Sequence, residues 1–390
     1  MKLYLFNPEN DLALADGGFS YCPPPAAMCI ANELSCLQLW YAGVEDAVLL
    51  PGGQHLEFRE KMSALFKLPL AYSQYMQSQI TALSPWGWSA QMRHRLKVMS
   101  FDNALLPSDE DVAEMRRLSS RVLTIEILTA LRNAGIDTPP LPQYVTSLDD
   151  AVAFVNSHSR CVVKAPWSGS GKGIMWGIGS AMEPMVNFCK GVIRRQGGVV
   201  CEHFLNAKAE FAMEFFAGAS GVEFAGYSLF TAENGAYTGN LLASNEEIEK
   251  QLSQYLPIDT LTVVRKQLCV ILEYVLAKSG YVGYLGVDMM VYDNGDTCRL
   301  NPCMEVNLRM NMGVVSRIFY DRFVCVGKPG IYRVRFFKQA GDAYHSHLEM
   351  KKRFPLMVKD GRVVEGYMNL VPVTPDNRYI AYVIIGNDVC

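Results

Sequence analysis

The segment VVKAPWSGSGKG, residues 162–173, carries the most informative pattern in this chain. Its β-branched start predicts a strand, in which alternate side chains face opposite ways, so Lys164 projects its ammonium from a rigid support. The loop that follows holds three glycines and Lys172, and glycine lets backbone N–H groups turn toward an anion. The residues after Gly173 predict a second strand. We therefore expect a hairpin that folds over phosphates, with Lys164 beneath them.

Two other phosphate-binding motifs do not fit this loop. In a Walker A motif, the first glycine would fall on Pro166, and the hydroxyl that binds magnesium would fall on Gly173. In a dinucleotide-binding fingerprint, the third glycine is out of place and a helix should follow instead of a strand. The loop taken alone also matches an ordinary glycine turn at a protein surface, and that alternative stays open.

Length, charge and cysteine content bound the kind of protein. With 390 residues the chain is too long for one hydrophobic core, so we expect two or three domains. A net charge of −3 provides no basic field for nucleic acid or for an anionic membrane. No segment approaches the about 20 uninterrupted apolar residues of a membrane span, and the first apolar run ends at Phe6, too early for a signal peptide. Its 11 cysteines are odd in number and scattered, which favours a cytoplasmic location over a disulfide framework.

The N-terminal region predicts a βαβ unit. Residues 2–6 and 47–50 have strand patterns, and residues 24–41 have helical spacing. The polar segment 7–11 then lies beyond the carboxyl end of the first strand, where ligands of open α/β sheets bind. It is a candidate substrate contact, although capping and turning explain these residues equally well.

The middle of the chain alternates strands and helices. A helix is predicted for residues 120–133, and Arg121 opens it, where an anion would meet both the guanidinium and the helix N-terminus. Residues 138–142 hold three prolines and predict a domain boundary. Further strands are predicted at 199–202, 210–216, 223–230, 236–242, 281–292 and 298–300, and further helices at 89–99, 149–156, 183–196 and 260–278.

A group of oxygen ligands follows the turn at residues 293–295. Alternation places Glu305, Asn307 and Arg309 on one face of an extended segment, and Asp288 on the partner strand points the same way. One such carboxylate would be an unremarkable surface acid. Two carboxylates and an amide beside an arginine are what magnesium bridging two phosphates requires.

Taken in order, these features resemble the ATP-grasp superfamily of ADP-forming carboxylate–amine ligases, over about residues 119–317. The resemblance implies an α/β chain in which a Rossmann-like domain (1–118) precedes an ATP-grasp domain (119–330) whose two α+β subdomains clasp ATP. Its small lid would cover about residues 140–205. A β-rich extension (331–390) would pack on the grasp domain.

The resemblance also assigns roles to residues. Lys164 matches the lysine that contacts the α- and β-phosphates, and residues 168–173 match the flexible flap. Residues 202–205 match the hinge that contacts adenine, and Glu210 matches the acid that binds the ribose hydroxyls. The implied nucleotide contacts are Arg121, Lys164, Ser168, Gly169, Ser170, Gly171, Gly173, Glu202, His203, Phe204, Leu205 and Glu210. The implied magnesium ligands are Asp288, Glu305 and Asn307, and the implied catalytic residues are Arg309 and Lys172.

Two departures from the family pattern matter. Arg121 stands where the family more often has lysine, which keeps the charge but changes the geometry. Glu305 follows Asp288 by seventeen positions, more than is usual, so we expect an insertion around residues 301–303, and the register of Asp288 stays open.

The resemblance implies activation of a substrate carboxylate by ATP to an acyl phosphate, attack by an amine, and release of ADP and phosphate. Mg2+ is the implied cofactor, with Mn2+ as an alternative, and the partners are a small-molecule carboxylate and a small-molecule amine. The oligomeric state is left undecided, with a homodimer as one alternative. A small-molecule kinase and a nucleotide-binding module without turnover are the alternative functions. Without nucleotide, the flap should be among the least ordered parts of the chain.

Overall fold

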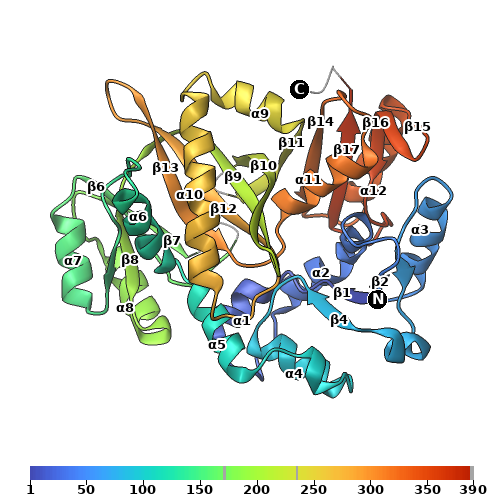
Figure 1. The fold of residues 1–390 in the computed structure, drawn as a ribbon, viewed down its shortest axis with the longest axis horizontal. Helices are drawn as coiled ribbons and strands as arrows, with labels where there is room; N and C mark the ends of the chain where they lie inside the picture. Colours follow the sequence, from blue (N-terminus) through green and yellow to red (C-terminus); the bar gives the residue numbers. More distant parts are fainter. Residues whose placement is uncertain (170–172, 234–235, 387–390) are drawn as a thin grey trace.

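The computed structural model describes residues 1–169, 173–233 and 236–386. Within that part of the chain the strands form three sheets (Figure 1). The N-terminal sheet is parallel, with strand order β3-β2-β1-β4. Its region comprises β1 (Lys2–Leu5), α1 (Asn10–Asp16), α2 (Pro25–Glu33), η1 (Ser35–Trp40), β2 (Ala47–Val48), α3 (Gly53–Ser63), β3 (Leu70–Ala71), η2 (Gln74–Gln79), β4 (Ala82–Pro85), α4 (Ala90–Val98), η3 (Asn103–Leu105) and α5 (Asp109–Leu118).

The second sheet is antiparallel, with strand order β5-β8-β6-β7, and we call this unit with its two helices the lid. Strands β6 and β7 pair as a hairpin, with Lys164 opposite Ile174, so the predicted hairpin is confirmed. The lid has a separate apolar core that includes Val163, Met185 and Cys201. Its elements are β5 (Gln143–Val145), α7 (Leu148–Asn156), β6 (Arg160–Lys164), β7 (Ile174–Ile178), α8 (Glu183–Gln196) and β8 (Val199–His203).

The third sheet has nine strands in the order β13-β12-β9-β10-β11-β14-β17-β16-β15, and each neighbouring pair is antiparallel. Its strands are β9 (Asn206–Gly218), β10 (Gly221–Glu233), β11 (Ala236–Leu242), β12 (Gly283–Asp293), β13 (Cys298–Asn307), β14 (Gly330–Phe336), β15 (Met357–Lys359), β16 (Arg362–Asn369) and β17 (Tyr379–Ile385). The helices beside it are α6 (Leu123–Asn133), α9 (Asn245–Leu252), α10 (Ile258–Leu276), α11 (Met312–Phe323) and α12 (Asp342–Arg353).

The two faces of this sheet differ in character. Paired residues of neighbouring strands share a face. Asp288 pairs with Glu305, and Glu214 pairs with Gly286, two residues before Asp288, so the three acids lie on one face of the sheet. We call it the site face. On the opposite face, Met213 and Phe215 join an apolar core with α6 and α10. Helices α6 and α10 therefore cover one face of the sheet, and the other face carries the acids.

The predicted insertion between Asp288 and Glu305 is a bulge in β13. Asp288 pairs with Glu305, but Met290 pairs with Asn301, so three residues of β13 lie opposite Met289 alone. Pro302 lies in this bulge, where its missing N–H costs no ladder hydrogen bond. The register that the sequence left open thus sets the two acids side by side.

Several predicted boundaries are wrong in detail. The helix expected at residues 24–41 divides into α2 and the 3-10 helix η1, because the Ser35 hydroxyl donates to the carbonyl of Asn32 and tightens the chain there. The polar loop at residues 7–11 is shorter than expected, since Asn10 and Asp11 already belong to α1. Helix α6 begins at Leu123, so Arg121 precedes the helix and does not open it.

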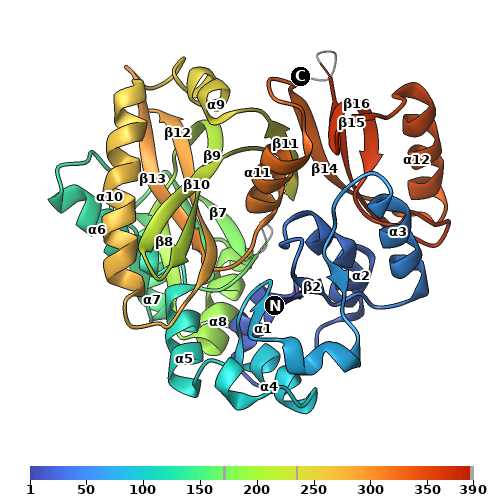
Figure 2. The same ribbon diagram turned by 45° about the vertical axis from the view of Figure 1, so that its right-hand side comes forward.

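The N-terminal and C-terminal regions lie together on the side of the molecule opposite the lid (Figures 1 and 2). Trp40 donates its indole N–H to the carbonyl of Leu370, and both belong to a core shared with α11. The C-terminal strands continue the nine-stranded sheet through the β11–β14 pair. The domain boundaries given above stay a prediction. No helix in the described ranges combines the length and apolar character that crossing a membrane requires.

Candidate active site

The predicted phosphate lysine forms a buried ion pair within the lid. Lys164 and Glu202 lie on adjacent strands β6 and β8, and Lys164 Nζ is 2.6 Å from Glu202 Oε2. Their side chains are 7% and 15% exposed, so little water screens the pair. The sequence assigned Lys164 to phosphate and Glu202 to the hinge, and the two residues prove to be direct partners.

The predicted cation Arg121 links the sheet to the hairpin. Its guanidinium is 2% exposed and donates to the carbonyls of Ala165 and Ser168. Arg121 Nη2 also lies 3.0 Å from Glu305 Oε2, so a predicted nucleotide contact is paired with a predicted magnesium ligand. A guanidinium held this way presents a fixed set of donors at the point where lid and sheet meet.

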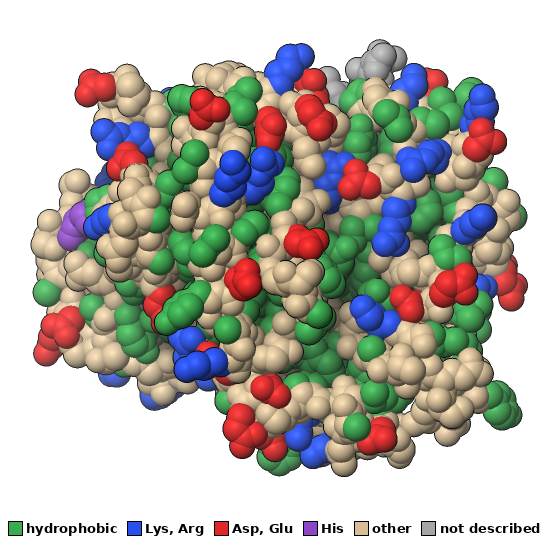
Figure 3. All heavy atoms as spheres, viewed as in Figure 1, with side chains coloured by type: hydrophobic (Ala, Val, Ile, Leu, Met, Phe, Trp, Pro, Cys, Tyr) green, Lys and Arg blue, Asp and Glu red, His purple; other side chains and the backbone are tan. Residues whose placement is uncertain are grey.

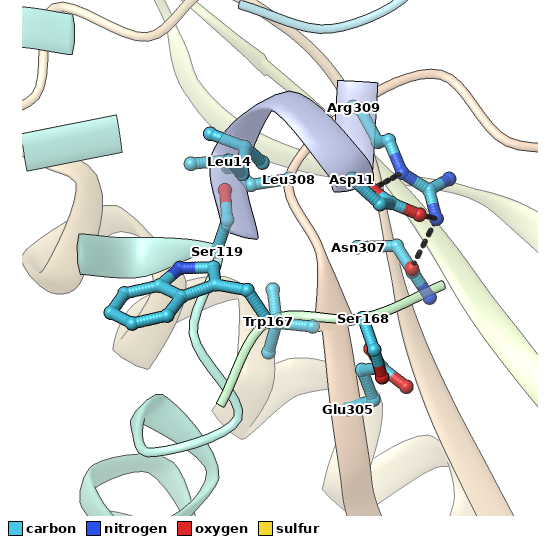
Figure 4. Close-up of a pocket in the computed structure, with 10 residues that line it drawn as sticks. Asp11, Leu14, Ser119, Trp167, Ser168, Glu305, Asn307, Leu308 and Arg309 are labelled. Carbon is cyan, nitrogen blue, oxygen red and sulfur yellow. Dashed lines mark hydrogen bonds and ion pairs between the residues drawn. The ribbon is translucent and has the colours of Figure 1, made fainter. Parts of the chain in front are cut away.

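The predicted catalytic arginine is held from two sides. Arg309 donates to both carboxylate oxygens of Asp11, at 2.6 and 2.7 Å, and to Asn307 Oδ1 at 2.9 Å (Figure 4). Asn307 Nδ2 in turn donates to Asp288 Oδ2 at 3.0 Å. This chain of contacts joins α1 of the N-terminal region to β13 and β12. Asp11 came from the polar segment that the sequence analysis marked as a candidate substrate contact.

The donor set at Asp288 fits a divalent cation in its chemistry. Burial raises the pKa of Asp288 to about 7, and the neighbouring negative charge of Glu305 adds to the shift, because both disfavour the ionised form. A cation between them would remove that repulsion, and carboxylate and amide oxygens are ligands that Mg2+ accepts. In the described residues no three His, Cys, Asp or Glu side chains gather as a metal cluster. The amide oxygen of Asn307, which now accepts from Arg309, and phosphate oxygens would therefore complete the set.

The hinge residues border a narrow pocket. Glu202, His203 and Leu205 line it together with prolines of the segment 139–142 and with Asn301 and Cys303 from the β13 bulge. The bulge therefore shapes a pocket wall.

Two other predicted nucleotide contacts lie apart from that pocket's lining. Phe204 packs under the guanidinium of Arg160, 3.5 Å from the ring centroid, and edge-on to Trp176. Glu210 is half-buried on β9, where burial raises its pKa and the charge of Lys164 lowers it.

The flap is described only in part. Ser170, Gly171 and Lys172 lie outside the described residues, and the prediction about flap order falls on them. Gly173 has φ +72°, a conformation that favours glycine, and a Cβ there would lie 2.7 Å from the Ser168 side chain. A Cβ on Gly169 would lie 2.2 Å from Asp11 Oδ2, so this glycine lets the start of the flap approach the Asp11–Arg309 pair.

A small hollow gathers most of these groups. Asp11, Ser168, Glu305, Asn307 and Arg309 line it, with Trp167 at its side (Figure 4). Over the molecular face drawn in Figure 3, Lys and Arg alternate with Asp and Glu. The hollow holds two acids, Asp11 and Glu305, and one cation, Arg309. Residues from α1, from the β6–β7 hairpin and from β13 meet in it.

Sequence reasoning missed one acid, Glu214 on β9. It is 1% exposed, and its Oε2 accepts from Asn311 Nδ2 at 2.8 Å. Burial raises its pKa to about 8, and the charge of Asp288 adds to the shift. The available signal was a glutamate in an otherwise apolar strand, AMEFFAG, at residues 212–218.

The chain has the ATP-grasp fold, which confirms the predicted fold class. N5-carboxyaminoimidazole synthetase from Staphylococcus aureus, complexed with ADP, matches 100% of this chain and 94% of its own length with 13% identity and a TM-score of 0.51. The biotin carboxylase–β-γ-ATP complex from Campylobacter jejuni matches 98% of this chain and 87% of its own length with 12% identity and a TM-score of 0.51. No family model and no curated protein sequence matched. At these identities the likeness concerns the fold.

The buried Glu214 predicts how stability depends on pH. Its pKa is about 8 in the folded chain against the ordinary 4.5, so between these values the unfolded chain ionises it and the folded chain does not. The unfolded state then binds fewer protons, and the free energy of unfolding falls as pH rises from about 4.5 to about 8. We expect the melting temperature of Glu214→Gln to fall less over this range than that of the native chain. Glu57→Gln, an exposed acid, is the control; identical profiles for all three would show that Glu214 ionises normally.

Proposed function

We propose that this chain is an ATP-dependent ligase that activates a carboxylate as an acyl phosphate and joins it to an amine, with release of ADP and phosphate. The observation that carries the proposal is that Arg121 joins Glu305 to the lid strand next to Lys164, while Arg309 is linked through Asn307 to Asp288. Nucleotide binding alone does not need an arginine fixed against the predicted metal acids, whereas phosphoryl transfer does. The ADP- and ATP-bound neighbours of the same fold support nucleotide as a ligand.

Binding of ATP would redistribute the existing ion pairs. Lys164 would exchange Glu202 for the α- and β-phosphates, which leaves Glu202 to the hinge, and Arg121 would exchange Glu305 for phosphate. Glu305 is then free to act with Asp288 and Asn307 as a ligand. Mg2+ bound there would neutralise phosphate charge during transfer. Because Lys164 and Arg121 are already held in place, binding of ATP would replace their carboxylate partners by phosphate without a large movement of either side chain.

The chemistry occurs in two balanced steps. A carboxylate oxygen attacks the γ-phosphorus, the bond from that phosphorus to the β-phosphate oxygen breaks, and ADP leaves. The amine nitrogen then attacks the acyl carbon, the bond from that carbon to the phosphate oxygen breaks, and inorganic phosphate leaves as the nitrogen loses a proton. Arg309, held by Asp11, would bind the oxygens on which charge develops in both steps.

A panel of amino acids and dipeptides, assayed for ADP release, tests this proposal. A ligase releases ADP faster only when an acid and an amine are both present, or forms a hydroxamate when hydroxylamine replaces the amine. A small-molecule kinase would release ADP with one substrate alone and form no hydroxamate. Nucleotide binding without any stimulated ADP release would favour the regulatory module.

Asp11 should act as a positioning residue for Arg309. In Asp11→Asn the bidentate contact is lost, so Arg309 loses its fixed orientation. We expect kcat to fall about ten-fold or more while KM for ATP changes much less. Asp16→Asn, an exposed acid of the same helix, is the control. An unchanged kcat, or a loss confined to KM for ATP, would contradict this role.

A further inference from the structure

A second cleft lies on the site face, next to the candidate active site. It has a volume of about 350 Å3 and separates α11 from one end of strands β9, β10 and β12. The lining residues used below are Glu214, Phe216, Tyr284, Val314 and Ile318. We call it the α11 cleft. Nothing in the proposed phosphate or hinge contacts uses it.

The inner end of the α11 cleft is built around the carboxylate of Glu214. A Cβ on Gly286 would lie 2.5 Å from Glu214 Oε2, and a Cβ on Gly313 would lie 2.2 Å from Glu214 Oε1. Any side chain at either position would displace the carboxylate. Asn311 donates to Glu214 with its amide nitrogen, and its amide oxygen accepts from Val314 N at the start of α11. Two strands and a helix cap thus combine to hold this one acid.

Among the described residues no cation forms an ion pair with Glu214, and Arg309, whose charge acts on it, is bound to Asp11. In the described part of the chain Asn311 is the hydrogen-bond donor to Glu214, and it reaches Oε2 only. The two arginines of the α11 cleft are engaged elsewhere: Arg317 binds Asp321 and the carbonyl of Ala243, and Arg322 binds the carbonyls of Tyr41 and Ala42. Ionising a buried carboxyl group without a counter-charge is costly, and a cationic ligand beside it would stabilise the ionised form.

The walls of the α11 cleft suit an apolar body that carries a positive charge. Phe216 and Tyr284 pack edge to face with ring centroids 4.9 Å apart. Val314 and Ile318 of α11 form the opposite wall. Aromatic faces attract organic cations, and three acids outnumber two arginines in the cleft lining.

We propose that the α11 cleft binds the amine substrate of the ligase reaction, a primary ammonium on an aromatic or aliphatic body, with its nitrogen against Glu214. The identification as substrate rests on the proposed function. Glu214 pairs with Gly286, two residues before Asp288, and Asn311 follows Arg309 by two residues. A nitrogen held at Glu214 is therefore adjacent to the groups that would hold the acyl phosphate.

The test measures binding of 2-phenylethylamine to the full chain by calorimetry, with 2-phenylethanol as the uncharged probe of nearly equal shape. The amine should bind the native chain at least about ten-fold more tightly than the alcohol. Glu214→Gln, which keeps an acceptor for Asn311, should lose that preference, and the exposed control Glu57→Gln should keep it. Equal affinity of the two probes for the native chain, or an unchanged preference in Glu214→Gln, would overturn the proposal.

A second variant covers the case in which Glu214→Gln does not fold. Ala225→Phe fills the α11 cleft from β10 and leaves the acid in place. It should abolish binding of 2-phenylethylamine, and retained binding would overturn the proposal.

Hydroxamate formation from ATP, an acid and hydroxylamine separates this inference from the proposed function, because it needs no amine site. If hydroxamate forms but the amine does not bind, the ligase function is supported and the assignment of the α11 cleft to the amine is wrong. If the amine binds but no acid gives a hydroxamate, the proposed ligase function is wrong, and so is the assignment of the amine as its substrate.

Discussion

Glu305→Gln should lower ATP-dependent turnover by about a hundred-fold or more while leaving the fold intact, because it removes one of the two carboxylates that we propose as Mg2+ ligands. Glu305 pairs with Asp288 across β12 and β13, and its side chain is 25% exposed, so the substitution buries no new group. Glutamine also keeps an oxygen for Arg121, which now donates to Glu305 Oε2. The effect should therefore fall on catalysis and not on stability.

Steady-state ADP release at saturating ATP measures this effect, with the melting temperature as the check on folding. Asp137→Asn is the matched control, since Asp137 also pairs with an arginine, Arg299, but at the surface. Binding of Mn2+ in the presence of ADP, followed by electron paramagnetic resonance, should weaken in Glu305→Gln and stay unchanged in Asp137→Asn. Native turnover in Glu305→Gln would remove this residue from the site.

Local sequence signals predicted the elements around the site well. Helix α8 spans Glu183–Gln196 as expected, since Gly197 ends it with φ +85°. The hairpin of β6 and β7 followed from a β-branched run, a glycine loop and a second run. Each signal lies within a few residues, where propensity and capping decide the structure.

The partners of the predicted site residues could not be predicted in the same way. Arg309 and Asp11 are 298 positions apart, and Arg121 and Glu305 are 184 apart. A pattern within one segment carries no information about which acid meets which cation when the sheets assemble. The ion pairs therefore emerged only from the fold, although most of their members had been named.

Glu214 and the β13 bulge illustrate two other limits. Glu214 alternates correctly as a strand residue, and only the contact with Asn311 and the glycines at 286 and 313 shows that its carboxylate is enclosed. The extra length before Glu305 was visible in the sequence, but its form was not. Only the pairing of Asp288 with Glu305 shows that the extra residues leave the acids in register.

Lys164 should contribute to ATP affinity through phosphate alone, and its ion pair with Glu202 dictates how that is measured. Removing Lys164 by itself leaves the 15%-exposed Glu202 carboxylate without its partner, which costs about 3–5 kcal/mol when such a pair is fully buried. In Lys164→Ala, a loss of ATP affinity could therefore not be separated from a loss of stability. The double variant Lys164→Met, Glu202→Gln removes both charges and keeps the volume of the side chains.

In the double variant we expect ATP affinity to fall about a hundred-fold, since a charged hydrogen bond in a dry site contributes about 1.5–3 kcal/mol. Adenosine affinity should change less than about three-fold, because glutamine at position 202 keeps a polar group of similar size and Leu205 and the backbone of the hinge remain. Lys208→Met breaks a lysine–carboxylate pair of similar length at the surface, with Asp293 at 3.0 Å, and should leave both affinities unchanged. Calorimetric titration of the three chains with each ligand gives the comparison. Equal losses for ATP and adenosine in the double variant would mean that Lys164 and Glu202 support the lid structurally and do not meet phosphate.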